Sequence, residues 1–226
     1  MSLEKSISNC GSKIFGGTIS RGVYATAIAV GVGFVVTPAA LAHHPFGSDT
    51  PASFIEGFLS GLGHPIIGLD HFAFVVAVGL LAVLRGKLGL VLPLLFTVAT
   101  AFGTAIHLQS INLPVPEIVI AASVLTIGIA LALQKNLNPI LLAVLGSVAG
   151  LFHGFAYGEA IFGAEMTPVA AYLIGFGSIQ LIISAIAFYL GSNLTSAQHN
   201  TSLPLRFAGC TIAGIGLTFL SGAILG

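Results

Sequence analysis

Long apolar runs separated by short polar connections dominate the chain after residue 42. The runs cover about residues 65–84, 88–108, 117–134, 139–162, 168–191 and 205–225. Each is close to the ~20 residues with which an α-helix crosses about 30 Å of hydrocarbon. None shows the strict alternation of a barrel strand. The pattern predicts an all-α integral membrane protein, a six-helix transmembrane bundle.

A shorter apolar pattern precedes the first run. Between Phe54 and Leu62 the apolar residues recur at helical spacing, with Glu56 and Ser60 among them. This spacing indicates either a short helix lying in the membrane interface or an early extension of the first span.

The N-terminal region has the order of a secretory signal. Lys5, Lys13 and Arg21 precede the 14-residue apolar run 23–36, and Ala40-Leu41-Ala42 follows it. This order predicts a signal peptide at residues 1–42, cleaved after Ala42, and the six predicted spans then form one membrane domain at 43–226. The alternative is an uncleaved anchor helix, although the run is at or below the roughly 17-residue minimum for spanning. Both alternatives place residue 43 outside.

Composition supports the membrane assignment and excludes other classes. Of 226 residues, 56% are hydrophobic and 6% charged, with a mean hydropathy of +1.05. An ordinary soluble domain has roughly 25% charged residues, and a nucleic-acid binder needs a basic surface. Cys10 and Cys210 are the only cysteines, too few for a disulfide scaffold or a thiolate metal cage. We therefore expect the lipid bilayer as a partner and no nucleic acid.

The remaining basic residues predict the orientation. Arg85, Lys87, Lys135 and Arg206 are the bases left after cleavage, and all four fall in connections on one side of the predicted bundle. The positive-inside rule makes that side cytoplasmic. The mature N-terminus and the C-terminus are then both outside.

Ionisable side chains inside or beside the spans are the candidate functional residues. A charged group at the centre of a bilayer costs at least ~2.5 kcal/mol, so such groups usually face a bundle interior and serve function. His43 and His44 directly follow the predicted cleavage site. After cleavage, the new α-amine and the imidazole of His43 could chelate one cation together. The candidate metal ligands are His43, His44, His64, Asp70, His71, His107, Glu117, His153 and Glu159.

Depth along the spans predicts which candidates meet. At 1.5 Å per residue, Asp70 and His71 lie roughly 8 to 9 Å below the outer start of their span, and His153 lies at a similar depth. The other candidates belong nearer the outer rim. His64 and His71 would be about 10 Å apart on a regular helix, too far to share one ion. Either Pro65 and Gly68 let the backbone unwind, or the two histidines are successive stations on an entry path.

The ligand types narrow the cation. Imidazole with carboxylate and no thiolate argues against Cu(I) and iron–sulfur sites and favours Ni²⁺ or Co²⁺, with Zn²⁺ left open. Structural roles compete with this interpretation: a lone membrane His107, Glu117 or Gln180 can simply be a hydrogen-bond partner. The glycines at 146, 150, 154 and 158 indicate close helix packing.

Two motifs resemble a known family. The segment 64–71, HPIIGLDH, matches the H-x5-D-H signature of the HupE/UreJ nickel and cobalt permeases, and 152–158, FHGFAYG, matches their F-H-G-x-A-x-G motif. The resemblance implies metal roles for His64, Asp70, His71 and His153, and less directly for Glu159 and His43. It also implies uptake of Ni²⁺ or Co²⁺ across a bacterial inner membrane, supplying hydrogenase, urease or a cobalamin pathway.

These observations lead to a hypothesis of transport rather than catalysis. His43, His44 and acids at the rim would capture a divalent ion from the periplasm, and Asp70, His71 and His153 would hold it before release inward. We expect no catalytic cofactor. The alternatives are an intramembrane metalloenzyme, for which H-E-x-x-H and G-x-S-x-G motifs are lacking, and a haem-binding electron carrier using His71, His107 or His153. Monomer and homo-oligomer both remain open.

Overall fold

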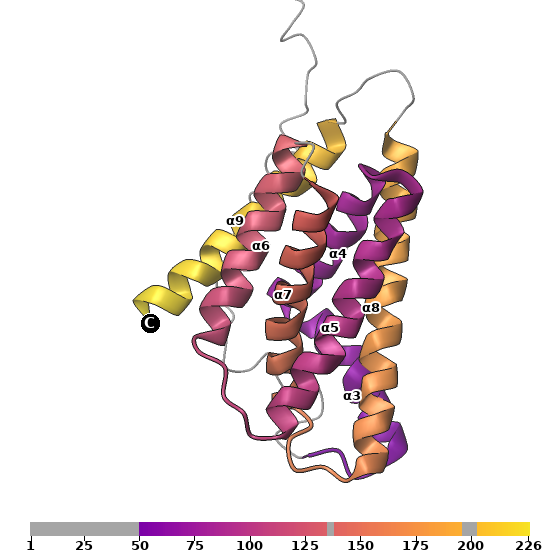
Figure 1. Ribbon diagram of the computed structural model, residues 1–226, viewed down its shortest axis with the longest axis vertical. Coiled ribbons are helices and arrows are strands. Elements are labelled where there is room, and N and C mark those ends of the chain that lie inside the picture. The colour runs from indigo at the N-terminus through magenta and orange to yellow at the C-terminus, as the bar shows by residue number, and fades with distance from the viewer. Residues whose placement is uncertain (1–49, 135–137, 196–202) are drawn as a thin grey trace, which may run out of the picture. The chain divides into compact units, whose positions relative to one another are not determined.

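The computed structural model describes residues 50–134, 138–195 and 203–226, and these form a helical bundle (Figure 1). The chain divides into residues 1–41 and 42–226, and every described residue belongs to the second unit. The predicted signal peptide and its cleavage site lie outside the described residues. The elements are α3 (Phe54–Ile67), α4 (Leu69–Val83), the 3₁₀ helix η2 (Gly86–Leu90), α5 (Val91–Leu108), α6 (Pro116–Leu133), α7 (Pro139–Glu159), α8 (Met166–Leu194) and α9 (Leu203–Leu225).

Five of these helices are each long and apolar enough to cross a membrane. They are α5 to α9, and they correspond to the predicted second to sixth spans. The α3 and α4 helices meet the same criteria only as a pair, bent by 81° at the break between them. The predicted first span at 65–84 is therefore wrong in its bounds. The apolar pattern that begins at Phe54 belongs to a helix continuing to Ile67, and the chain breaks at Gly68.

Local sequence explains the break. The hydroxyl of Ser53 caps the start of α3 by accepting a hydrogen bond from the Glu56 N–H at 3.2 Å. Pro65 lacks an N–H and weakens the last turn. Gly68 then adopts an extended conformation (φ −72°, ψ 104°) before α4 begins. A Cβ at this position would lie 2.7 Å from Cδ2 of His71, so the close approach of that ring requires glycine.

The bent pair packs along one side of α8. Proceeding along the chain, Gly57 lies against Pro168, Gly61 against Tyr172 and Gly79 against Ser184. At each glycine a Cβ would lie only 2.3–2.4 Å from a carbonyl oxygen of α8, so the backbones are in direct contact. Because the contact numbers rise together, α3 and α4 advance in the same direction along α8, whose 29 residues are long enough to reach both.

The predicted glycine stripe on α7 packs against α5. Added Cβ atoms at Gly150, Gly154 and Gly158 would lie 2.8, 1.9 and 2.6 Å from atoms of Phe96, Thr100 and His107, respectively. Gly146 faces open space instead. Similar close approaches join α6 to α9 at Gly128, Gly209 and Gly216. Small residues thus decide which helices are neighbours.

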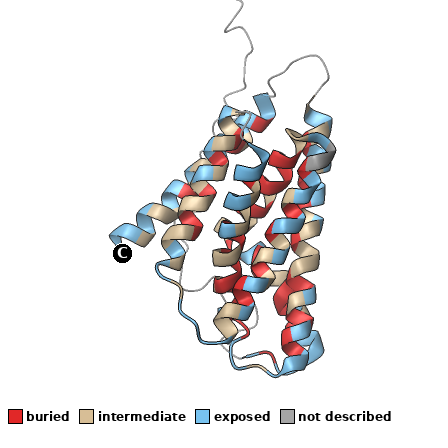
Figure 2. Cartoon of the chain, in the orientation of Figure 1, coloured by how far each residue is buried: buried red, intermediate tan, exposed pale blue. Residues whose placement is uncertain are grey.

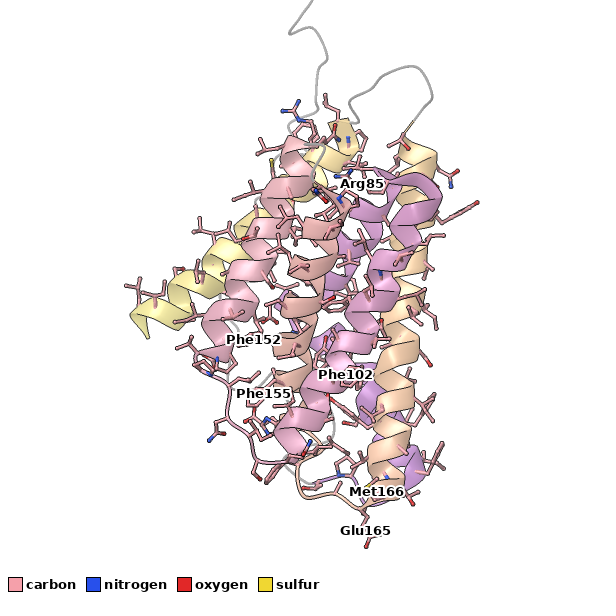
Figure 3. All side chains as sticks on the ribbon, in the orientation of Figure 1. Arg85, Phe102, Phe152, Phe155, Glu165 and Met166 are labelled. Carbon is pink, nitrogen blue, oxygen red and sulfur yellow. The ribbon has the colours of Figure 1, made fainter. Side chains whose placement is uncertain are left out.

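The described basic residues lie at one end of the bundle. Arg206 Nε donates to the carbonyl oxygen of Ala132 at 3.2 Å, near the end of α6. Gly191 on α8 lies beside side chains from the end of α4 and the start of α9, so Arg85 and Arg206 share this end. Figure 3 shows Arg85 at the top and Glu165 at the opposite end. This placement is the one that the positive-inside argument requires.

Burial follows the pattern of a bundle surrounded by lipid. Apolar side chains such as Ile55 (70% exposed) and Ile140 (72% exposed) lie on the outside, and Figure 2 shows the buried residues along the inward faces of the helices. A core cluster around Phe74, Val75 and Phe96 fills one level of the interior. Buried polar side chains lie beside this cluster, and they include His64, His71 and His153.

Candidate functional site

Two histidines from distant parts of the chain meet in the interior. Nδ1 of His71 on α4 lies 2.7 Å from Nδ1 of His153 on α7, and each residue is at most 1% exposed. The predicted common depth of these residues agrees with this contact. The ring of His153 also contacts Phe74, and the two ring centroids are 4.6 Å apart. The imidazole pair is therefore shielded on one side by aromatic carbon.

The helix break brings a third histidine to the same place. The ring centroids of His64 and His71 are 6.0 Å apart, well under the ~10 Å expected on a regular helix. Tyr157 on α7 lies against both rings, with centroid distances of 5.0 Å to His64 and 4.7 Å to His71. The interpretation in which Pro65 and Gly68 draw the histidines together agrees with this geometry. We call His64, His71, His153 and Tyr157 the histidine chamber.

The proton on His153 is placed by a neighbouring serine. Ser123 Oγ on α6 donates its single hydrogen to the carbonyl oxygen of Ile120 at 2.6 Å. The same Oγ lies 3.1 Å from Nε2 of His153. Because the hydroxyl hydrogen is already used, Nε2–H of His153 must be the donor. Neutral His153 therefore carries its lone pair on Nδ1, facing His71.

A tyrosine places the proton on His64 in the same way. Tyr172 Oη on α8 donates to the carbonyl oxygen of Tyr157 at 2.8 Å and lies 3.1 Å from Nδ1 of His64. The hydroxyl can then only accept from the ring, so His64 carries its hydrogen on Nδ1 and its lone pair on Nε2. Metal-binding histidines in proteins are oriented by such bonds from the other ring nitrogen.

The tautomer of His71 follows from that of His153. With a lone pair on Nδ1 of His153, the 2.7 Å contact requires His71 to donate its Nδ1–H. An ion bound by both nitrogens at about 2.0–2.1 Å would need them more than 3 Å apart. Binding of a cation to this pair must therefore displace the shared hydrogen and part the rings.

Asp70 lies at the edge of the chamber. It is half-buried in the first turn of α4, where the helix dipole favours a negative charge. Its Oδ1 accepts a hydrogen bond from the backbone N–H of His71 at 2.9 Å. Its charge acts on the hydroxyl of Tyr157. A carboxylate thus lies next to the imidazoles at the start of α4.

The other predicted ligands lie apart from the chamber. His107 packs between Phe155 and Phe162, at centroid distances of 4.5 and 5.5 Å. Glu117, at the start of α6, and Glu159, at the end of α7, are exposed. These positions agree with the predicted outer rim. His43 and His44 lie outside the described residues.

The arrangement is not a ready-made metal cage. Among residues 50–134, 138–195 and 203–226, no three His, Cys, Asp or Glu side chains are placed to hold one ion together. The three imidazoles are close, but two of them bond to each other. The site can accept a cation only by rearranging, which distinguishes it from a closed structural site.

Several residues of the site were not among the predicted ligands. Ser123, Tyr172, Thr100 and Gln180 all bond within or beside the chamber, and the ring of Tyr157 lies against two of its histidines. Hydroxyl and amide side chains are common in membrane helices, so their sequence positions carry little signal. Gln180 is the exception, because it is isolated in a long apolar span and the sequence indicates a hydrogen-bond partner there; its side chain is fully buried and bonds to Thr100.

An apolar groove borders the chamber on another side. Its volume is about 310 Å³, and it lies between α4, α6 and α7. Ser123 and Thr126 are the hydroxyl groups in its wall, which otherwise consists of side chains such as Val78, Ala122 and Ala149. This wall offers a cation almost no ligands, in contrast to the chamber.

Comparison with known proteins agrees with the motifs. Residues 29–219 match the family model described as HupE / UreJ protein. Protein HupE of Rhizobium leguminosarum bv. viciae is 32% identical over 170 residues, covering 74% of this chain and 86% of that protein. No solved structure matches the chain. On the strength of the family match and the relative, this chain belongs to the HupE/UreJ family.

Proposed function

We propose that the chain is a permease that takes up Ni²⁺ or Co²⁺ from the periplasm through the histidine chamber. The HupE/UreJ family is associated with nickel and cobalt transport. The observation that carries the proposal is the meeting of His64, His71 and His153 in a membrane interior. Imidazole nitrogens with neighbouring oxygens suit these cations, and buried ionisable groups in membrane helices mark ion pathways.

The geometry favours passage over storage. A transported ion must bind well enough to enter and weakly enough to leave. In the chamber, the His71–His153 hydrogen bond of 2.7 Å competes with the cation for both Nδ1 atoms. Reformation of this bond would help to expel the ion after it has moved inward.

Charge at the two ends supports the inward direction. Exposed Glu165 lies at the end opposite Arg85 (Figure 3). Exposed Glu117 lies in the first turn of α6, whose other end contacts Arg206, and exposed Glu159 follows Gly158, which meets His107 at the end of α5. His43 and His44 are predicted on the same side as these acids. They would raise the local concentration of a divalent cation. The membrane potential contributes about 2.3 kcal/mol per charge per 100 mV, or ~4.6 kcal/mol for a divalent ion. This energy suffices for roughly thousandfold accumulation.

Uptake by a double variant tests the proposal. We expect Asp70→Asn with His71→Ala to abolish nickel and cobalt accumulation in a transporter-deficient bacterial host, because the carboxylate and a chamber imidazole are both lost. Glu56→Gln is the matched control, since it neutralises an exposed carboxylate at the far end of α3. Wild-type accumulation by the double variant, at equal membrane abundance, would refute the proposal.

Purified protein in proteoliposomes separates transport from the other hypotheses. Uptake of Ni²⁺, Co²⁺ and Zn²⁺ in competition measures the cargo directly. A metalloenzyme would show turnover without net ion flux. A haem carrier would show a visible absorption band, and the direct contact of His71 with His153 leaves no room for a haem iron between these rings.

A further inference from the structure

Gln180 is a fully buried amide that the proposed transport route does not yet use. It lies on α8, between Phe176 of the aromatic cluster beside the chamber and Ser184, which bonds to Val75 on α4. A buried amide without hydrogen bonds is costly in an apolar interior. We therefore expect both ends of the Gln180 amide to have polar neighbours.

The hydrogen bonds of Thr100 determine how the amide is turned. Thr100 Oγ1 lies 2.7 Å from the carbonyl oxygen of Thr97 and 3.1 Å from the amide atom that the structure assigns as Oε1 of Gln180. Amide oxygen and nitrogen are assigned from the hydrogen bonds they make. A hydroxyl has one hydrogen, and the shorter bond to the Thr97 carbonyl takes it. Gln180 must then donate its NH₂ group to Thr100 Oγ1. In the opposite orientation, the NH₂ group is buried with no hydrogen-bond partner.

The other end of the amide, its carbonyl oxygen, then faces the side of Tyr157. The Tyr157 hydroxyl is fully buried, with the Gln180 amide and the Asp70 carboxylate as its polar neighbours. It makes no hydrogen bond of regular geometry. The ring of the same tyrosine lies against both His64 and His71. The phenol ring thus lies against the imidazoles, and the Gln180 amide lies beside the hydroxyl of that phenol.

We propose that Gln180 and Tyr157 form an oxygen-bearing wall of the cation site, and that Thr100 is the positioning residue that turns the Gln180 carbonyl toward it. This inference rests on the proposed function and deepens it. A divalent ion in the chamber would meet imidazole nitrogens on one side and neutral oxygens on the other. Ni²⁺ and Co²⁺ accept such mixed surroundings with more than four donors, whereas Zn²⁺ is satisfied by four, and three imidazoles nearly supply them.

The oxygen wall therefore predicts a role in selectivity. Removing it should leave a nitrogen-rich site that favours Zn²⁺ relative to Ni²⁺. Gln180→Leu removes both ends of the amide, and Thr100→Val removes the acceptor that orients it while nearly preserving volume. Thr100→Ser keeps the hydroxyl and should restore wild-type behaviour. Ser184→Ala is the matched control, because it removes another buried hydroxyl contact of α8 that lies outside this wall.

The experiment measures inhibition of Ni²⁺ uptake by Zn²⁺ in proteoliposomes containing the full chain. The measured quantity is the inhibitory Zn²⁺ concentration divided by the Km for Ni²⁺. For Gln180→Leu and Thr100→Val we expect this ratio to fall about fivefold, because each variant loses one orienting hydrogen bond and a fivefold change corresponds to the loss of one such bond. Thr100→Ser and Ser184→Ala should stay within about twofold of wild type, since they leave the wall intact. If Gln180→Leu does not fold, Thr100→Val decides the question alone.

The outcomes separate this inference from the proposed function. Unchanged Zn²⁺ inhibition in folded Gln180→Leu or Thr100→Val protein, with wild-type uptake intact, overturns the oxygen wall and leaves the permease standing. Equal shifts in Ser184→Ala and Thr100→Val also overturn it, because they would show a general packing effect. Wild-type proteoliposomes that take up none of the three cations would instead overturn the proposed function, and the oxygen wall with it.

Discussion

The break at Gly68 is expected to control the contact between His71 and His153. In Gly68→Ala, the new Cβ would lie 2.7 Å from Cδ2 of His71, and ordinary contact begins at 3.4 Å. The backbone at Gly68 has φ −72° and ψ 104°, which alanine adopts without strain. The substitution therefore acts through the His71 ring, which must move by about 0.7 Å.

That displacement is large compared with the bond it affects. If the ring moves away from α7, the Nδ1–Nδ1 distance grows from 2.7 Å toward about 3.4 Å, near the limit for a hydrogen bond. Losing a buried hydrogen bond costs roughly 1–3 kcal/mol. We expect nickel uptake to fall about tenfold, with the thermal midpoint of the detergent-solubilised protein lowered by a few degrees.

The control is the same substitution where it meets nothing. Gly146 lies on α7 with no atom near its missing Cβ, so Gly146→Ala should leave uptake unchanged and stabilise the helix by up to about 1 kcal/mol. Initial rates of nickel uptake and thermal unfolding are measured for both variants at equal protein content. Wild-type uptake by Gly68→Ala would show that the close approach of His71 is unnecessary, and the reasoning would fail.

Substitutions at three further positions test packing and tautomers. Gly154→Leu should prevent stable folding, because even a Cβ would lie 1.9 Å from the carbonyl oxygen of Thr100; thermal unfolding and membrane abundance check this. Tyr172→Phe removes the acceptor for His64 Nδ1–H and should weaken nickel binding by 10–100-fold in equilibrium dialysis; unchanged affinity contradicts the tautomer assignment. Ser123→Ala should reduce uptake through His153, and Ser123→Thr should retain it; equal rates for the two would count against the serine's role.

The sequence predicted the helices well because each span must satisfy its own backbone hydrogen bonds within hydrocarbon. It was less informative about the first span. Apolar length alone does not show that Phe54–Ile67 and Leu69–Val83 are two helices bent by 81°. Pro65 and Gly68 indicated that unwinding was one of two options. The packing of α3 and α4 against α8 selects the bent arrangement.

The candidate site was also predicted in part by the sequence and in part decided by helix packing. Scarcity of charge in an apolar chain singled out His64, Asp70, His71 and His153, because each ionisable group is expensive in a bilayer. The same argument could not separate them from His107, which packs against phenylalanines instead. Depth along a helix is readable from the sequence, but the direction in which a side chain faces depends on neighbouring helices.

By itself, the sequence determined the class of protein, the approximate spans, the sorting of bases to one end and the depth of the candidate ligands. These properties depend on composition and on 1.5 Å of rise per residue. Only the tertiary structure decided that His71 bonds to His153, and that Ser123, Tyr172 and Thr100 bond to His153, His64 and Gln180, respectively. The physical reason is that such hydrogen bonds join residues from different helices, whose relative rotation is set by glycine-mediated backbone contacts rather than by any local pattern.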